Sequence, residues 1–69
     1  MMRGRSSIEL DAPGRHVVRV EVESGVGSVT VHHGEEMVWG QCGTPAWALR
    51  CAAEAVEEPE RFRRWQDRG

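Results

Sequence analysis

The stretch from His16 to His33, HVVRVEVESGVGSVTVHH, alternates valines with polar residues over most of its length. Side chains on a strand point alternately to opposite faces, so this period of two predicts strands with one buried face. Between the two halves lies the segment 24–27, SGVG, whose residues tolerate the positive φ angles that a tight reversal requires. The stretch therefore predicts a β-hairpin with one buried face and one solvated face.

Two further strands extend this hairpin. The segment 7–11 alternates in the same way and is followed by the turn signal Ala12-Pro13-Gly14. After the predicted strands at 16–23 and 28–33, the pair Gly34-Glu35 matches a two-residue type II′ turn. A fourth strand at 37–39 would end at Gly40. Consecutive strands joined by short turns predict an antiparallel meander.

The region after the strands predicts a helix at 44–58. Thr44 suits the N-cap position and Pro45 suits the first helical position. The spacing of i, i+3, i+4 and i+7 gives one apolar stripe, which we expect to lie on the sheet: Leu49, Ala52, Ala53 and Val56. Pro59 either ends this helix or begins a short one at 59–67, in which Phe62 and Trp65 are three residues apart.

The length of 69 residues predicts a single small α+β domain spanning 1–69. It divides into a flexible arm at 1–6, a meander of three or four strands at 7–39, the main helix, and the short terminal helix. A chain of this size buries only about 60% of the surface of its unfolded form. A deep catalytic cleft is therefore not expected, and binding through an exposed surface is favoured.

Composition narrows the class of protein further. The formal net charge is −2, with eleven acidic residues against nine basic ones, all of them arginine, which differs from the clear basic excess of a typical nucleic-acid binder. No apolar run approaches the roughly 20 residues of a membrane span, and the N-terminus lacks the apolar segment of a signal peptide. We expect a cytoplasmic protein without a membrane partner, in which Cys42 and Cys51 are free thiols.

The solvated face of the predicted sheet is the first candidate site. If the valines point inward, four carboxylates surround Arg19 on the outer side: Glu9, Asp11, Glu21 and Glu23. Such an acidic face can dock on a basic groove, because complementary potentials steer association. The alternative is an ordinary solvated face whose charges discourage edge pairing.

Two tryptophans are candidate anchors for a partner, since tryptophan is enriched among binding hot spots. On a helical wheel Trp47 lies away from the predicted core, although it can also pack on the loop that contains Trp39 and Gly40. If Val38 faces the core, Trp39 and Met37 lie on the outer side; a bulge would turn them inward. The sequence leaves both questions open.

Metal binding and nucleophilic catalysis receive little support. The two cysteines are nine residues apart, and the adjacent His32 and His33 would point to opposite faces of a strand, so no zinc-ligand spacing is present. No orienting group or oxyanion site accompanies a Cys-His pair. Gly25-Val26-Gly27 lacks the residues of a phosphate loop. We expect neither a metal nor a cofactor.

The arginines form the competing site. Those in the N-terminal arm and the terminal helix can contact phosphates, with Trp65 stacking on a base: Arg3, Arg5, Arg61, Arg63, Arg64 and Arg68. Equally, the terminal arginines can pair with Glu57, Glu58 and Glu60 on a solvated helix.

Two resemblances bear on function. The order of three strands and a helix opening at Thr44-Pro45-Ala46-Trp47 resembles the AP2/integrase-type DNA-binding domains, which read the major groove with a sheet face. Here that face would carry carboxylates, which oppose phosphate. In size and layout alone, the chain resembles the small phage-encoded inhibitors called anti-CRISPR proteins, many of which occupy a nucleic-acid path or subunit surface of a CRISPR effector.

The leading expectation is a non-enzymatic inhibitor or masking protein, anti-CRISPR-like, that docks its acidic face on a larger basic or nucleic-acid-handling complex. The partner-binding residues would be Glu9, Asp11, Glu21, Glu23, Trp39 and Trp47. The alternative is a small nucleic-acid-binding domain that uses the arginines, and a third option is an accessory subunit or antitoxin-like protein. We expect a monomer or weak dimer.

Overall fold

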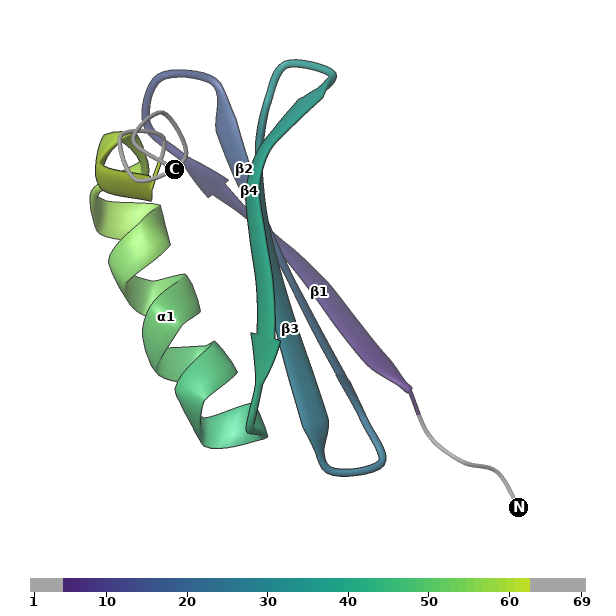
Figure 1. The fold of residues 1–69 in the computed structure, drawn as a ribbon. Coiled ribbons are helices and arrows are strands. Elements are labelled where there is room, and N and C mark those ends of the chain that lie inside the picture. Colours follow the sequence, from purple (N-terminus) through teal and green to yellow (C-terminus); the bar gives the residue numbers. More distant parts are fainter. Residues whose placement is uncertain (1–4, 63–69) are drawn as a thin grey trace.

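Four antiparallel strands form one sheet in the order β1-β2-β3-β4, and a helix packs on one of its faces (Figure 1). The computed structural model describes residues 5–62. The strands are β1 (Ser6–Ala12), β2 (His16–Glu23), β3 (Val26–His33) and β4 (Glu36–Gly43), and the helix α1 is Pro45–Glu57. This arrangement confirms the predicted α+β class and the meander.

Tight turns with left-handed backbone connect the strands. Ser24 and Gly25 form the turn between β2 and β3, with φ angles of 53° and 78°. Two consecutive residues with positive φ are the pattern of a type I′ turn, whose twist matches that of the flanking strands. Because the turn needs only these two residues, β3 begins at Val26 and not at 28 as predicted. Gly34 has a φ of 67° at the first position of the next turn, as expected for type II′.

A β-bulge in β4 decides which way its large side chains point. Val31 pairs with Trp39, whereas the next residue, His32, pairs with Met37, so Val38 is an extra residue in the ladder. Trp39 therefore shares a face with Val31 and is 6% exposed, while Met37 lies on the opposite face and is 57% exposed. The strand does not end at Gly40 as predicted; it continues to Gly43 in register with β3.

The helix begins where the sequence predicts. The backbone of Thr44 is extended, and its hydroxyl oxygen accepts a hydrogen bond from the Trp47 amide at 3.1 Å. Pro45 is the first helical residue. After Glu58, residues 59–62 form a second short helical turn that begins with Pro59. Residues 63–67 of the predicted terminal helix, including Trp65, lie outside the described residues, as do residues 1–4 of the predicted arm. Within that arm, Ser6 already belongs to β1.

The buried side of α1 is made of alanines, which corrects the predicted stripe. Ala48, Ala52 and Ala55 are at most 3% exposed, whereas Leu49 is 60% exposed. Of the other predicted stripe residues, Ala53 is exposed and Val56 is half-buried. The physical cause lies in β3, because a Cβ atom on Gly27 would be 2.7 Å from the Cβ of Ala48. A close approach of helix and sheet leaves room only for small side chains.

The core lies between α1 and the inner face of the sheet. It contains valines of the two central strands, the alanines of α1 and two aromatic rings: Val18, Val20, Val29, Val31, Trp39, Ala48, Ala52, Ala55 and Phe62. Phe62 and Trp39 meet edge to face with ring centroids 4.7 Å apart. This contact holds the helical turn at 59–62 against the sheet. No helix within residues 5–62 is long and apolar enough to cross a bilayer.

Candidate functional site

The outer face of the sheet, defined as the face opposite α1, is left uncovered by the described elements. Both α1 and the helical turn at 59–62 pack on the inner face (Figure 1). The strand register brings the outer side chains together in rows across the four strands. These side chains are Ser7, Glu9, Asp11, Val17, Arg19, Glu21, Glu23, Val26, Ser28, Thr30, His32, Met37 and Cys42. The outer face is therefore polar, with charges concentrated on β1 and β2.

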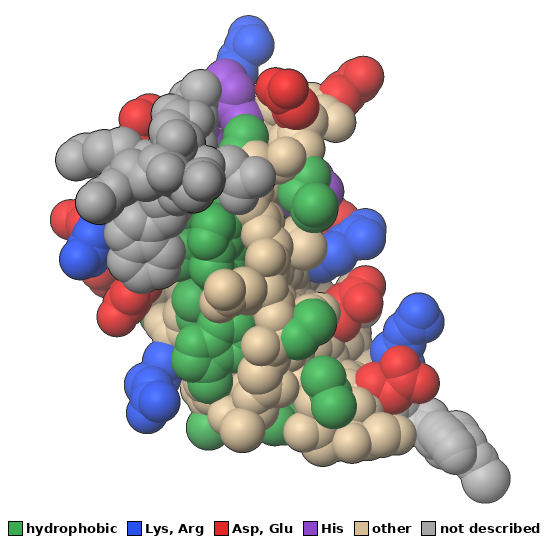
Figure 2. All heavy atoms as spheres, in the orientation of Figure 1, with side chains coloured by type: hydrophobic (Ala, Val, Ile, Leu, Met, Phe, Trp, Pro, Cys, Tyr) green, Lys and Arg blue, Asp and Glu red, His purple; other side chains and the backbone are tan. Residues whose placement is uncertain are grey.

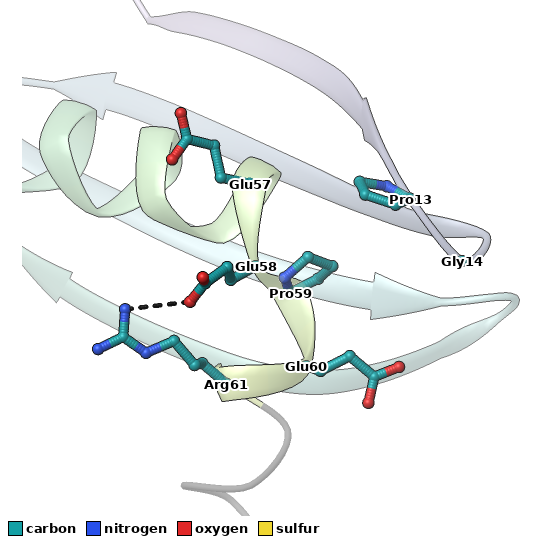
Figure 3. A pocket seen from close by; sticks show the side chains of 7 residues that line it. All are labelled: Pro13, Gly14, Glu57, Glu58, Pro59, Glu60 and Arg61. Carbon is teal, nitrogen blue, oxygen red and sulfur yellow. Dashed lines mark hydrogen bonds and ion pairs between the residues drawn. The ribbon is translucent and has the colours of Figure 1, made fainter.

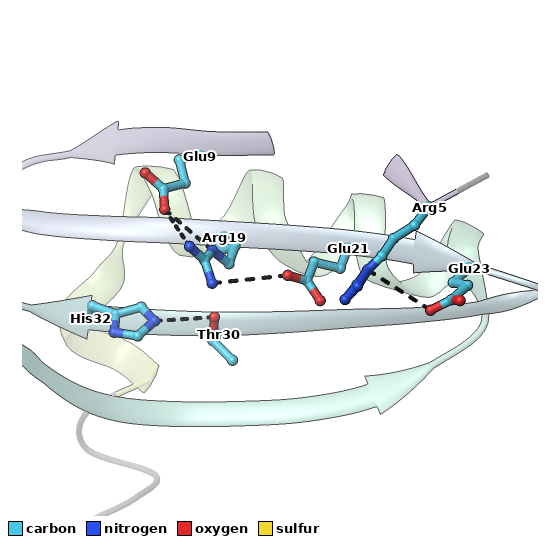
Figure 4. Close-up of polar contacts among 7 residues, drawn as sticks. All are labelled: Arg5, Glu9, Arg19, Glu21, Glu23, Thr30 and His32. Atoms are coloured by element: carbon cyan, nitrogen blue, oxygen red, sulfur yellow. Dashed lines mark hydrogen bonds and ion pairs between the residues drawn. The ribbon is translucent and has the colours of Figure 1, made fainter. Parts of the chain in front are cut away.

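Arg19 forms the centre of the charged half. Its Nε and Nη2 atoms both donate to Oε2 of Glu9, at 3.2 and 2.9 Å, across the β1–β2 pair (Figure 4). Its Nη1 atom lies 3.9 Å from a carboxylate oxygen of Glu21 on the same strand. All three side chains remain substantially exposed, so each contact contributes at most about 1 kcal/mol to stability. The network orients the groups more than it stabilises the fold.

The outer face keeps an excess of negative charge. Arg5 lies 3.9 Å from the carboxylate of Glu23, which adds a second guanidinium group to the face. Three of the four predicted carboxylates thus contact these two guanidinium groups, and with four carboxylates against two guanidinium groups the face has a net charge of −2. Among the described residues, the Asp11 carboxylate has no ion-pair partner. The predicted acidic surface exists, but Glu9 and Arg19 form an internal pair within it.

The half of the outer face on β3 and β4 is neutral and slightly hollowed. His32 Nε2 and the Thr30 hydroxyl are 3.3 Å apart, above a hollow of about 190 Å³ that also touches Met37 (Figure 4). A neighbouring hollow of about 360 Å³ lies at the border with the charged half and is lined by Val26 and Cys42 together with Ser24, Ser28, Glu21 and Glu23. Met37 and Val26 are 57% and 52% exposed. This half therefore offers apolar contacts beside the charged half.

Neither predicted tryptophan anchor lies on the outer face. Trp39 is buried in the core because of the bulge at Val38, one of the two outcomes that the sequence left open, so it is not exposed as an anchor on this face. Trp47 is half-buried and packs over Gly43, where a Cβ atom would come within 2.8 Å of its ring. Figure 2 shows the strip of hydrophobic side chains between α1 and the sheet. There Trp39 and Trp47 line a hollow of about 190 Å³.

The hollow at the end of α1 does not gather its charges around one point. It measures about 450 Å³ and is lined by Pro13, Gly14 and residues 57–61. Figure 3 shows the side chains of Glu57, Glu58 and Glu60 pointing in different directions. Glu58 accepts a hydrogen bond from Arg61 at 3.3 Å. The carboxylates therefore do not converge on a ligand position.

The histidines separate as the strand pattern predicts. His32 lies on the outer face, whereas His33 lies on the inner side with its ring centroid 4.6 Å from that of His16. His16 is 2% exposed and its Nδ1 donates to the Pro13 carbonyl oxygen at 2.8 Å. Its Nε2 has no hydrogen-bond partner among the described residues. Within residues 5–62, no three His, Cys, Asp or Glu side chains come together to hold a metal ion.

The two cysteines are free and lie on different surfaces. Cys42 is exposed on the outer face, while Cys51 is half-buried on α1 and packs against the core. Burial, with a smaller contribution from the nearby Glu54 carboxylate, raises the pKa of the Cys51 thiol. A raised pKa lowers the thiolate fraction at neutral pH, which is the opposite of what an activated nucleophile requires.

The arginines of the competing site are not brought together where the structure describes them. Arg5 pairs with Glu23 beside the β2–β3 turn, whereas Arg61 pairs with Glu58 beside Pro13 and Gly14, at the other end of the sheet. Each guanidinium group already faces a carboxylate. Arg3, Arg63, Arg64 and Arg68 lie outside the described residues.

Comparison with known proteins identifies no relative from which a function can be inferred. No family model, no curated protein and no solved structure matches this chain. The outer face and its chemistry therefore carry the functional argument.

Proposed function

We propose that this chain is a non-enzymatic protein-binding module that docks its outer face on a positively charged surface of a larger partner and masks it. The observation that carries the proposal is the uncovered outer face with its net charge of −2. A sheet face with surplus carboxylates is complementary in charge to a basic surface, and the adjacent apolar side chains supply contact area that excludes water. Glu21, Glu23 and Asp11 supply the charge, and Met37 and Val26 supply the apolar contacts.

The same face argues against direct contact with phosphates. Carboxylates repel a phosphate backbone, and the central guanidinium group of Arg19 is already held by Glu9 at 2.9 Å. A protein that neutralises phosphates needs cations free to release counterions from nucleic acid. A basic protein surface is the better complement to this arrangement.

The partner we propose is a nucleic-acid-handling complex, because such complexes present extended basic surfaces that a negatively charged face can occupy. Occupying that surface would inhibit the complex, as in the anti-CRISPR-type inhibitors that the chain resembles in size and layout. This role places the protein in the cytoplasm.

The proposal is tested by affinity capture with an outer-face variant and a charge-matched control. The test variant is Glu21→Arg/Glu23→Arg, which reverses two outer-face charges. The control is Glu54→Arg/Glu57→Arg, which makes the same change in charge on exposed positions of α1. Each tagged protein is incubated with bacterial lysate at low and moderate salt, with and without nuclease, and retained proteins are identified by mass.

We expect a discrete protein to survive nuclease, to be retained by the control, and to bind the test variant at least about tenfold more weakly, a loss of about 1.4 kcal/mol. Equal retention by both variants would remove the outer face from the proposal. Capture that disappears with nuclease would favour nucleic-acid binding through the arginines, with affinity that falls steeply as salt rises.

A further inference from the structure

The free edge of β1 is the feature that the proposed docking face leaves unexplained. β1 is the first strand of the sheet, and within residues 5–62 only its β2 side is paired. Its seven residues pair with β2 in unbroken register and include no proline. The opposite edge, β4, is interrupted by the bulge at Val38, and bulges are a common protection against further pairing. Of the two edges, β1 is the one ready to accept another strand.

An exposed apolar side chain stands on this edge. Ile8 lies on the inner side of the sheet, in the row of Val20 and Val29, yet it is 52% exposed. Leu49 of α1 is 60% exposed and follows the sheet-facing Ala48 by one residue, on the side of the helix away from the Trp47 hollow. The described residues therefore leave apolar surface uncovered along the β1 side of the molecule.

The backbone alternation determines which residues can pair outward. Glu23 and Val26 close the two-residue turn between β2 and β3, and the pair that closes such a turn is hydrogen-bonded. Odd-numbered residues of β2 therefore direct their peptide groups toward β3, and even-numbered residues direct theirs toward β1. Since Val20 pairs with Ile8, the even-numbered residues of β1 face β2. The odd-numbered residues of β1, including Ser7 and Glu9, face the free edge.

Charge and the Ile8 side chain together favour one register for a second copy of this edge. A pair centred on Ser7 would set Arg5 against Glu9, which already holds Arg19 at 2.9 Å, and would leave Ile8 opposite Ser6. An antiparallel pair centred on Ile8 places Arg5 opposite Asp11 of the other copy, and Ser7 opposite its Glu9. Both pairs consist of residues that face the free edge, so the ladder can be hydrogen-bonded. Centring the pair on Glu9 would instead set two Glu9 carboxylates against each other, and like charges directly opposite are destabilising. The Asp11 carboxylate, which has no ion-pair partner within residues 5–62, gains one in the arrangement centred on Ile8.

We propose that β1 pairs antiparallel with β1 of a second copy of this chain, about a two-fold axis at Ile8. The two Ile8 side chains then form a non-hydrogen-bonded pair, the type in which side chains are closest. Two Arg5–Asp11 ion pairs flank them on the outer side, as the symmetry requires, with each Arg5 guanidinium group shared between Asp11 of the other copy and Glu23 of its own, which lies 3.9 Å away. The dimer has one continuous eight-stranded sheet, and its outer face is twice as wide as that of one chain.

Disulfide trapping tests the register. The test uses a chain whose native cysteines are replaced, Cys42→Ser/Cys51→Ser. In this chain the variant Ile8→Cys places the new thiol opposite the same thiol of the second copy, at a separation that a disulfide spans. The control Ser6→Cys lies on the same face of the same strand, but its copy would be four residues away along the ladder, about 13 Å. We expect oxidation to link Ile8→Cys into a dimer at least about tenfold faster than Ser6→Cys, by non-reducing gel. Equal rates, or faster linkage of Ser6→Cys, would overturn the register.

Charge exchange tests the ion pairs in the otherwise native chain. Arg5→Asp and Asp11→Arg each create two like-charge pairs in the dimer, and the double variant restores attraction. Sedimentation equilibrium should show each single variant dissociating at least about tenfold more readily than the native chain, with recovery in the double variant.

Two further observations complete the test. Ile8→Lys should abolish the dimer, while Val26→Lys, at an equally exposed position far from the free edge, should leave it intact. Circular dichroism checks that every variant is folded. A native chain that stays monomeric at all accessible concentrations would overturn the proposal, as would folded charge variants with unchanged dissociation. Neither result depends on the lysate partner, so this inference and the docking function fail separately.

Discussion

Gly27 sets the distance between the helix and the sheet. A Cβ atom there would lie 2.7 Å from Ala48 Cβ and 2.9 Å from Pro45 Cα. Separations below 3 Å between such atoms require movement, and here the neighbours include helix backbone. The absence of a side chain at this position therefore allows α1 to rest directly on β3.

Gly27→Ala should accordingly lower the free energy of unfolding by about 1–3 kcal/mol, the usual cost of overpacking a core. In a domain of this size that corresponds to a melting temperature lower by at least about 4 °C. Thermal and urea denaturation measure the change. Gly40→Ala is the matched control, since its nearest contact is the terminal methyl of Thr30 at 3.2 Å, and we expect a smaller loss. A larger loss for Gly40→Ala would contradict this assignment.

The thiols should differ in reactivity. Because burial raises the pKa of Cys51, its thiolate fraction at pH 7 to 8 is reduced, and the thiolate is the nucleophile. We expect iodoacetamide to modify the exposed Cys42 first, with the difference in rate narrowing as pH rises through the pKa of Cys51. Peptide mass spectrometry after timed quenching measures both rates. In denaturant the two rates should converge, and faster labelling of Cys51 in the folded protein would contradict the prediction.

Sequence alternation identified most inner and outer residues of the central strands, but it could not place Met37 and Trp39. Both outcomes for these residues were open, because one extra residue in a strand reverses the faces of everything on one side of it. The bulge at Val38 depends on how β4 matches β3, and that long-range pairing has no local signature. The ion pair between Arg5 and Glu23 was missed for a related reason: Arg5 was assigned to an arm outside the sheet.

At the scale of elements, the position of α1 was predicted correctly, but the face that it buries was not. The alanine stripe and the stripe containing Leu49 are one residue apart, about 100° on the helix. Hydrophobicity alone favours the stripe with leucine and valine. The observed face follows from Gly27 and the close approach that it allows, information that lies in a strand and not in the helix.

Leu49→Ala should therefore change stability by no more than about 0.5 kcal/mol, as for an ordinary exposed position. Ala52→Leu, on the face that touches the sheet, should destabilise by about 1–3 kcal/mol because there is no space for the added atoms. Parallel urea titrations compare the two variants. A larger loss of stability for Leu49→Ala than for Ala52→Leu would favour the buried stripe that the sequence predicts.

The start of α1, in contrast, was predicted correctly from local chemistry. Thr44→Ala removes the oxygen that accepts from the Trp47 amide and should cost about 1 kcal/mol. Thr44→Ser retains an oxygen at the same position and should recover most of that loss. Helicity and unfolding midpoint by circular dichroism provide the measurement; identical midpoints for the alanine and serine variants would exclude a capping role.

For the whole molecule, the aromatic contact between Phe62 and Trp39 joins the last described turn to the sheet. Phe62 is 2% exposed although it follows the main helix and a proline. A domain of 69 residues has little core to lose, so contributions from beyond α1 matter for the stability of the entire fold.

Phe62→Ala should destabilise the protein by about 3–5 kcal/mol, a large share of the stability available to so small a domain. Phe62→Leu, which retains apolar volume, should lose clearly less. Urea denaturation followed by tryptophan fluorescence reports the loss. Unfolding curves for Phe62→Ala that coincide with the native curve would show that the helical turn contributes nothing to the core.

The fold class and strand order followed from the sequence, because period-two alternation, turn residues and helix capping are local signals. The binding surface followed only in part. Carboxylate positions came from the alternation, whereas the hollowed neutral half and the burial of Trp39 depend on how four strands twist and align.

The bulge at Val38 also restricts how this chain can change in length. Deleting Val38 would remove the extra residue and restore plain alternation, so that Met37 would still face outward and Trp39 would still face the core. Deleting a residue within 40–43 would instead leave the bulge in place and move the residues after the deletion to the opposite face of the sheet. Loss of one residue is therefore tolerated at Val38 and opposed in the rest of β4.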